Sequence, residues 1–334
     1  MNNKAKMRIL VTGASGFIGA SVIQVLCNQG FQVCCLVRST SNIQRIEHLN
    51  WQRFEGDTLD YNSVVKAMRG CDGIIHLAGT SDWNKISSKD MWSSIVNGTK
   101  NVFKAAKSEG CRRAVFVSSM SAVNGSNSPE LMNETTPCSL PKNEPAFEYV
   151  RAKQTSEKNC LGLSDNNFKV IIVNPPETYG PNDINLITAK NLIDLYSSKP
   201  TLVPKGGSLI GHVDDVAQGI VAAYVKGRAG ERYILGGENT DFFNLVTTLF
   251  NILEEDRRII VVPTFLMRTL TKICVKLNLT LPYNPIIIPY ATRYWYFDTS
   301  KASKELGIEF RNLRETLKPT VAWLKEAGLI NTRR

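Results

Sequence analysis

The stretch Thr12-Gly13-Ala14-Ser15-Gly16-Phe17-Ile18-Gly19 decides the fold, because it joins an apolar run at Arg8–Thr12 to an amphipathic stretch at Ile18–Gln29. Its three glycines let the backbone turn tightly and approach a pyrophosphate. The helix that starts here offers free N–H groups and a partial positive charge to that group. The stretch therefore predicts a strand, a turn and a helix that together bind a dinucleotide.

Apolar runs alternate with helix-length stretches through the first half of the chain. The predicted strands lie at Arg8–Thr12, Gln32–Val37, Gly73–Leu77, Ala114–Ser118 and Val170–Asn174. Amphipathic stretches such as Ser63–Met68 and Met91–Ser108 separate them. This alternation implies parallel strands joined by right-handed crossovers. We expect an α/β fold with a Rossmann-type, doubly wound parallel sheet, whose ligand crevice lies at the carboxyl ends of the strands.

The alternation loosens after Asn174, where prolines begin to recur. We expect a dinucleotide-binding domain over residues 1–174, to which residues 211–236 return. Residues 175–210 and 237–334 then form most of a smaller, discontinuous substrate-binding lobe.

The composition excludes several classes of protein. The chain has 334 residues, 43% of them hydrophobic, and a formal net charge of +10. It can bury a large core, so it is not disordered. The sequence contains no uninterrupted run of about 18 apolar residues, so we expect no membrane-spanning helix. Eight scattered cysteines without a C-x-x-C pair, together with three histidines, predict neither a metal site nor a disulfide framework. This cysteine usage suits a reducing compartment, and we expect a cytoplasmic protein.

The end of the second predicted strand bears on the choice of dinucleotide. An NAD enzyme favours a carboxylate there, which binds the ribose 2′-hydroxyl. The sequence reads Leu36-Val37-Arg38-Ser39 instead. Arg38 suits a 2′-phosphate and so favours NADP, with NAD still open. Alternatively, Arg38 is an ordinary solvated arginine.

A tyrosine and a lysine four residues apart carry the candidate chemistry. Tyr149 and Lys153 lie on one face of a predicted helix. A free tyrosine has a pKa near about 10, and a nearby ammonium group would lower it. The serines at 118, 119 and 121 follow a predicted strand, and a hydroxyl there can polarise a substrate carbonyl.

These motifs together resemble the extended branch of the short-chain dehydrogenase/reductase superfamily, that is, the NAD-dependent epimerases and dehydratases. They occur in the family's order along nearly the whole chain. The Asn174-Pro175 segment is similar to that of reductases resembling dihydroflavonol reductase, where many nucleotide-sugar members carry an arginine in place of the asparagine. The match also resembles the bacterial group that includes hopanoid-associated sugar epimerases.

The resemblance implies a role for particular residues. It places Ser119, Tyr149, Lys153 and Asn97 in the catalytic set, with Ser118 or Ser121 as alternatives for the serine. Asp57 matches the position that contacts the adenine amino group, although it could instead cap a helix. The full set of implied cofactor contacts is Gly13, Ser15, Gly16, Phe17, Ile18, Gly19, Arg38, Asp57, Thr58, Leu77, Ala78, Gly79, Tyr149, Lys153 and Pro175.

The activity implied is NAD(P)-dependent oxidation or reduction at a CH–OH or C=O group, and we expect a ketone or aldehyde reductase of the dihydroflavonol reductase type. One alternative is an epimerase of nucleotide-linked or lipid-linked sugars. A dehydratase is disfavoured, because Met120 and Ser121 follow Ser119 where such relatives carry an Asp-Glu pair. An alternative of another class is a protein that senses NADP without turnover.

The stretch 257–297 stands apart in charge. It contains six basic residues and no acidic one. Leu266, Leu270, Ile273 and Leu277 follow helical spacing, which predicts an amphipathic helix packed on the substrate lobe. The alternative is a basic, apolar entrance for a lipid-like substrate, peripheral to the inner membrane face.

Other partners follow less directly. The +10 charge and the glycine-rich turn favour a lipid-like or phosphate-bearing small molecule, and the basic residues show no nucleic-acid-binding motif. Trp83 and Tyr179 are candidate pocket residues. The resemblance also makes a homodimer a candidate state, since a dimer is common among relatives.

Overall fold

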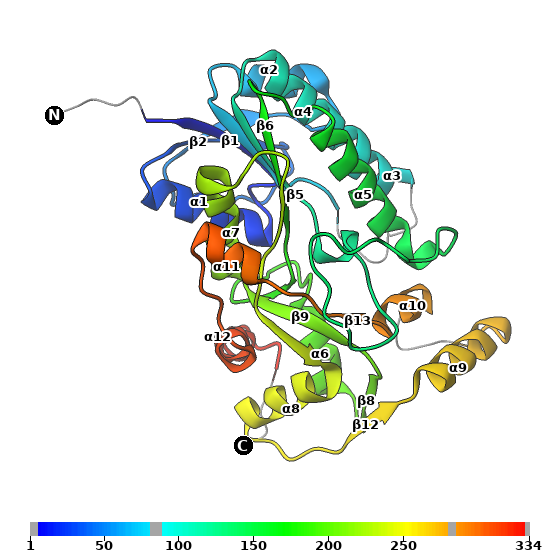
Figure 1. Ribbon diagram of the computed structural model, residues 1–334. Helices are drawn as coiled ribbons and strands as arrows, with labels where there is room; N and C mark the ends of the chain where they lie inside the picture. The colour runs from blue at the N-terminus through cyan, green and yellow to red at the C-terminus, as the bar shows by residue number, and fades with distance from the viewer. Residues whose placement is uncertain (1–5, 81–88, 280–284, 331–334) are drawn as a thin grey trace.

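The computed structural model describes residues 6–80, 89–279 and 285–330, and a seven-stranded parallel sheet forms its centre (Figure 1). The strand order is β10-β6-β5-β4-β1-β2-β3. The strands are β1 (Arg8–Thr12), β2 (Gln32–Val37), β3 (Trp51–Glu55), β4 (Gly73–His76), β5 (Arg113–Val117), β6 (Lys169–Asn174) and β10 (Arg232–Ile234). The order reverses between β1 and β4, so the doubly wound Rossmann-type fold is confirmed.

Alternate side chains of the strands serve two cores. In β1, Ile9 and Val11 join the core under helices α1 (Phe17–Asn28) and α7 (Val213–Lys226), whereas Leu10 joins the core on the opposite face. That second face is covered by α2 (Tyr61–Met68), α4 (Gly98–Ser108) and α5 (Glu148–Leu161). Both faces of the sheet are buried, which explains the nearly continuous apolar runs of its strands.

Sequence reasoning missed β3. Its residues Trp-Gln-Arg-Phe-Glu are mixed in polarity and half exposed, because the strand lies at the sheet edge and pairs only with β2. The helix predicted at Met91–Ser108 is present as α3 (Lys89–Trp92) and α4, with a π-helical turn at Ser93–Asn97 between them.

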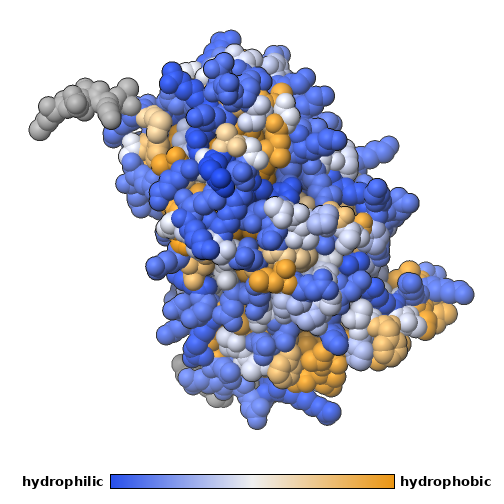
Figure 2. Space-filling model, viewed as in Figure 1, coloured by the Kyte–Doolittle hydropathy of each residue, from blue (hydrophilic) through white to orange (hydrophobic). Residues whose placement is uncertain are grey.

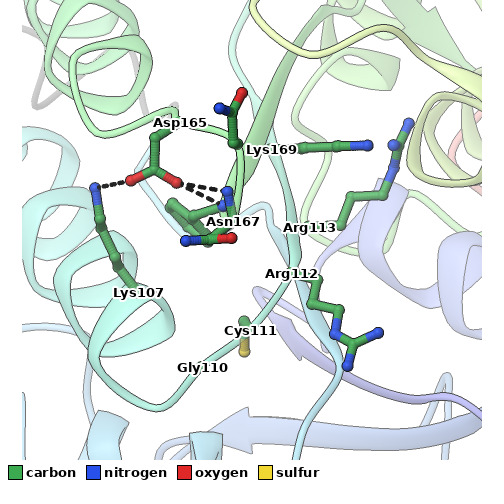
Figure 3. A pocket seen from close by; sticks show the side chains of 10 residues that line it. Lys107, Gly110, Cys111, Arg112, Arg113, Asp165, Asn167 and Lys169 are labelled. Atoms are coloured by element: carbon green, nitrogen blue, oxygen red, sulfur yellow. Dashed lines mark hydrogen bonds and ion pairs between the residues drawn. The ribbon is translucent and has the colours of Figure 1, made fainter.

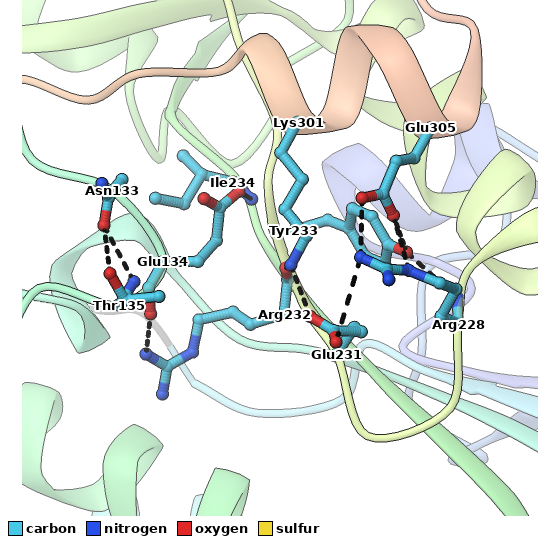
Figure 4. Close-up of polar contacts among 10 residues, drawn as sticks. All are labelled: Asn133, Glu134, Thr135, Arg228, Glu231, Arg232, Tyr233, Ile234, Lys301 and Glu305. Atoms are coloured by element: carbon cyan, nitrogen blue, oxygen red, sulfur yellow. Dashed lines mark hydrogen bonds and ion pairs between the residues drawn. The ribbon is translucent and has the colours of Figure 1, made fainter.

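The other edge strand, β10, is covered by charged side chains (Figure 4). Its Ile234 N–H donates to Glu134 Oε1 at 3.0 Å. From helix α11 (Ser300–Leu306), Lys301 pairs with Glu231, and Glu305 accepts two hydrogen bonds from Arg228. These contacts close an edge that could otherwise pair with another chain. Strand β10 thus belongs to the main sheet, and helix α7 packs beside α1 on one face of that sheet, while the domain boundaries at 174 and 237 remain a prediction.

Most of the remaining elements, among them α6 (Ala189–Ser197), α8 (Phe242–Leu253) and α12 (Leu313–Glu326), pack around a separate core. A small sheet joins β7 (Glu177–Tyr179), β9 (Gly207–His212), β11 (Glu238–Asp241) and β13 (Tyr294–Trp295). A parallel pair joins β8 (Thr201–Pro204) to β12 (Ile259–Val262). The other helices here are α9 (Thr264–Lys276) and α10 (Ile288–Ala291). Within the described residues, no helix is long and apolar enough to cross a membrane.

Candidate active site

A cavity of about 1310 Å³ runs from the glycine-rich turn, past the carboxyl ends of β1, β4, β5 and β6, to the elements around the small sheet. Its position is that of the ligand crevice of doubly wound sheets. Its walls include all the residues predicted to contact a cofactor, and Ser119 as well. The chain thus brings together side chains that lie up to 160 positions apart, from Ser15 to Pro175.

The turn after β1 is built for close approach of a phosphate. Gly13 has φ +73°, and a Cβ on Gly19 would lie 2.1 Å from the Gly13 carbonyl oxygen. Gly16 is the N-cap of α1, and it has no side chain to accept hydrogen bonds from the first N–H groups of that helix. Those donors therefore face the cavity with the positive end of the helix dipole, so the turn fits the pyrophosphate of a dinucleotide.

The adenosine end of the cavity is lined by Arg38, Asp57 and Thr58. Arg38 is exposed, and its guanidinium pairs with no carboxylate in the described part of the chain. Asp57 does not cap α2, because Asp60 does so by accepting from the Asn62 N–H. Asp57 Oδ1 instead accepts from the Leu59 N–H at 2.9 Å. Both side chains thus border the cavity: the guanidinium of Arg38 suits a phosphate on the adenosine, and the carboxylate of Asp57 suits the adenine amino group.

Tyr149 and Lys153 project from α5 into the middle of the cavity. Lys153 is 5% exposed, and its Nζ donates to the Val117 carbonyl oxygen at 3.0 Å. Burial lowers the pKa of Lys153 to about 8, although Glu157 opposes this shift. Burial also raises the pKa of Tyr149 to about 12, against a hydrogen bond with Ser119. The sequence argument that the ammonium group lowers the pKa of Tyr149 is therefore wrong for this structure: Nζ lies 5.8 Å from the centre of the tyrosine ring, and burial dominates.

The structure separates the three candidate serines. Ser119 is the one that hydrogen-bonds Tyr149, and its Oγ lies 2.9 Å from Ser121 Oγ. Ser121 in turn contacts the hydroxyl of Tyr290. Ser118 Oγ is buried and has no hydrogen-bond partner within residues 6–80, 89–279 and 285–330. Of the three, Ser119 has the geometry of a catalytic serine.

A buried polar network, which sequence reasoning missed, holds the Ser119 backbone. Asn174 Nδ2 donates to the Ser119 carbonyl oxygen at 2.7 Å and to Glu157 Oε1 at 2.8 Å. Arg232 pairs with the other oxygen of Glu157. Glu157 lies one helical turn after Lys153, so the spacing could have identified it. The network links the two catalytic elements, β5 and α5, to the sheet edge at β10.

His76 is structural. It is fully buried, and its two ring nitrogens lie 2.6 Å from Thr12 Oγ1 and 2.9 Å from Thr99 Oγ1. Burial, with help from the charge of Lys153, lowers the pKa of His76 to about 3. The ring is therefore neutral at physiological pH and fixes β4 beside β1.

The prediction for Asn97 needs correction. Its side chain is exposed, it donates to Ser93 Oγ at 3.2 Å, and it does not line the cavity. The π-helical turn places Ile95 inward instead: Ile95 is buried, and its carbonyl oxygen accepts from Ser156 of α5. Trp83, the other candidate near this helix, lies outside the described residues.

The far end of the cavity is lined by both apolar and polar side chains. Tyr179 and Tyr290 line it, together with Met267 and Leu270 of α9. The Tyr290 ring stacks on the buried Trp295 with centroids 4.2 Å apart. The substrate half of the cavity thus combines aromatic and aliphatic side chains, several of them from the stretch 257–297, with polar ones such as Glu177, Asn191 and Asp194.

A second hollow of about 730 Å³ lies at the opposite end of the sheet, where β5 and β6 begin (Figure 3). It is lined by several basic residues. Lys107 pairs with Asp165 at 2.7 Å, and Arg113 donates to the carbonyl oxygens of Ala223 and Gly227. Lys107 and Arg113 are thus engaged within the protein, whereas the exposed Arg112 and Lys169 form no ion pair in the described part of the chain.

Comparison with known proteins identifies the family of the chain. The NAD dependent epimerase/dehydratase family matches residues 9–236. A Synechocystis sp. protein provisionally named dihydroflavonol 4-reductase is 30% identical over 333 residues, which is 96% of either chain. Sterol demethylase protein B of Methylococcus capsulatus is 27% identical and covers 97% of this chain and 100% of its own.

Solved structures agree as well. The crystal structure of gox2253 superposes with a TM-score of 0.85 at 29% identity, and the match covers 97% of this chain and 99% of the other. The chain therefore belongs to the NAD dependent epimerase/dehydratase family, the extended short-chain dehydrogenases/reductases, and is an NAD(P)-dependent enzyme of that type.

Proposed function

We propose that the protein is an NADPH-dependent reductase of ketones or aldehydes. One observation carries the proposal: Ser119, Tyr149 and Lys153 line the same cavity as the glycine-rich turn, and Arg38 stands at its adenosine end without an ion-pair partner in the described ranges. The aromatic and aliphatic side chains that the stretch 257–297 contributes to the cavity, together with the similarity to a protein named dihydroflavonol 4-reductase, support a carbonyl substrate over a sugar nucleotide.

The chain's own groups would hold the dinucleotide at three places. The N–H groups after Gly16 would bind the pyrophosphate, Arg38 would bind the 2′-phosphate, and Lys153 would bind the ribose next to the nicotinamide. When bound, the nicotinamide supplies the hydride.

Tyr149 supplies the proton. With a pKa of about 12, its phenol stays protonated at neutral pH, so it is ready to donate to the oxygen of a carbonyl that is being reduced. The Ser119 hydroxyl would donate a hydrogen bond to the same oxygen and hold it beside Tyr149. Lys153 keeps a positive charge near the tyrosine below about pH 8. At neutral pH these groups thus hold the proton that reduction of a carbonyl consumes.

The direct test mixes the protein with NADPH and a panel of apolar ketones. We expect stoichiometric loss of NADPH absorbance, and we expect Tyr149→Phe to lower kcat/KM by about 10²- to 10⁴-fold while NADPH still binds. Interconversion of a sugar without net cofactor change would show the alternative, an epimerase. NADPH binding together with no reaction that Tyr149→Phe alters would show the third candidate, a protein that senses NADP.

Two further proposals concern partners. The substrate is a lipid-like or phosphate-bearing small molecule that reaches the site near 257–297, where a peripheral membrane contact would bring it. The homodimer remains a prediction, which sedimentation equilibrium of the pure protein would test.

A further inference from the structure

Helix α9 exposes an apolar stripe that sequence reasoning expected to be packed. Leu266, Leu270, Ile273 and Leu277 are 39%, 47%, 47% and 62% exposed. The buried residue of this helix is Thr271, on a different face. Figure 1 shows α9 projecting from the body of the molecule. The expectation that the stripe covers the substrate lobe is therefore wrong, and an apolar face is left facing outward.

The stripe is part of a larger apolar surface. Phe265 at the start of α9 is exposed, as are Leu202 of β8 and Val261 of β12, two strands that pair with each other. Figure 2 shows hydrophobic surface over this end of the molecule. Contiguous exposed apolar surface of this kind marks a site of protein or membrane contact.

The basic residues of 257–297 divide into two groups. Arg257 pairs with Glu255, Arg268 donates to Thr292 Oγ1 at 3.0 Å, and the buried Arg293 donates to the Gly125 carbonyl oxygen. These three stabilise the fold.

The other group is free. Arg258, Lys272 and Lys276 are exposed, and none of them forms an ion pair in the described part of the chain. Lys205, whose carbonyl oxygen accepts a hydrogen bond from Thr264 at the start of α9, is exposed and unpaired as well. The exposed apolar stripe is thus accompanied by unpaired positive charge, the pattern of helices that lie in the surface of anionic membranes.

The same helix forms part of the wall of the cavity. Met267 and Leu270 line it, and so do Ile287 and Ile288 just beyond. Leu270 belongs to both surfaces, since it is in the exposed stripe and in the cavity wall. An apolar path therefore leads from the outer face of α9 to the substrate half of the site.

We propose that α9 docks the cavity mouth onto an anionic phospholipid bilayer, with the stripe at the level of the acyl chains and Lys272 and Lys276 among the headgroups. Resting on the proposed reductase function, this makes the substrate a membrane-soluble ketone. A second copy of the chain is a poorer occupant. No acidic residue lies in 257–297, so a symmetric pairing of this face would oppose lysines to lysines.

Co-sedimentation of the full chain with vesicles tests the proposal. At low ionic strength we expect binding to vesicles of equal phosphatidylcholine and phosphatidylglycerol, and weaker binding to phosphatidylcholine alone. Ile273→Asp with Leu277→Asp should lower the ratio of bound to free protein by about tenfold or more. The matched control, Leu131→Asp with Val225→Asp, changes two equally exposed apolar residues elsewhere and should bind as the unchanged protein does.

Three results would overturn the docking. The unchanged protein could stay in the supernatant, the two double variants could bind equally well, or sedimentation equilibrium could show a dimer that only the α9 variant dissociates. The last result would identify a second copy as the occupant. NADPH oxidation with a water-soluble ketone is measured in parallel. Ile273 and Leu277 lie outside the cavity, so their substitution should not change this rate. If the unchanged protein binds vesicles but oxidises no NADPH with any ketone, the reductase proposal fails and the docking proposal stands.

Discussion

The buried lysine of the active site lowers the stability of the fold. Lys153 has an ordinary pKa of 10.5, which burial lowers to about 8. Each tenfold change in proton affinity corresponds to about 1.4 kcal/mol, so keeping the charge inside costs the folded state about 3 kcal/mol below pH 8. Lys153→Met removes the charge with little change of volume.

The variant also loses the hydrogen bond from Nζ to the Val117 carbonyl oxygen, which stabilises the fold by about 1 kcal/mol. We therefore expect Lys153→Met to be more stable than the unchanged protein by about 2 kcal/mol near pH 7, although it reduces ketones far more slowly. A residue kept for activity at the expense of stability has this signature.

The stability difference between Lys153→Met and the unchanged protein should depend on pH. Because the pKa is lower in the folded state, the unfolded state binds more protons between about pH 8 and 10.5, and the stability contributed by this group rises with pH across that window. The advantage of Lys153→Met should therefore shrink from about pH 8 upward and vanish near pH 10. Urea unfolding followed by circular dichroism at a series of pH values measures it.

A matched control separates burial from a general charge effect. Lys158 lies on the same helix and is exposed, so Lys158→Met should change stability little and equally at each pH. The reasoning is refuted if Lys153→Met is less stable than the unchanged protein near pH 7. It is equally refuted if the difference between the two proteins stays constant from about pH 8 to 10.

Three other predictions follow from single contacts. Arg38→Ser should weaken NADPH binding by about 10- to 100-fold in fluorescence titrations and leave NADH binding unchanged, since only a 2′-phosphate needs the guanidinium. Asn174→Leu should lower the free energy of unfolding by about 1–3 kcal/mol and lower kcat more than it raises KM, because the buried Glu157 carboxylate loses a donor and the Ser119 backbone loses its anchor. Gly19→Ala should cost at least about 2 kcal/mol in urea unfolding and abolish NADPH binding, since its Cβ would overlap a backbone oxygen. Unchanged NADPH affinity, unchanged kcat and unchanged stability, respectively, would contradict them.

Local sequence determined much of the fold. Strands β1 and β2 have the predicted bounds, and β4, β5 and β6 differ by a residue at one end or both, because strands buried on both faces need continuous apolar runs. The glycine-rich turn could also be recognised from the sequence, since only glycine allows the close approach of position 19 to the Gly13 carbonyl oxygen. The edge strand β3 was not predicted, because a strand with half-exposed faces has no continuous apolar run.

What a side chain faces was decided by tertiary structure. Helical spacing identified Tyr149 and Lys153 as neighbours, but the burial that raises the pKa of one and lowers that of the other comes from elements distant in sequence. The π-helical turn at Ser93–Asn97 directs the side chain of Asn97 outward, and no rule of residue spacing predicts such a turn.

The stretch 257–297 shows the same division. The sequence by itself determined its amphipathic period and its charge. Only the fold decided that three of its arginines bind protein groups, and that the apolar stripe of α9 faces outward beside a cavity. Periodicity fixes which residues share a face, whereas the arrangement of the rest of the chain fixes what that face meets.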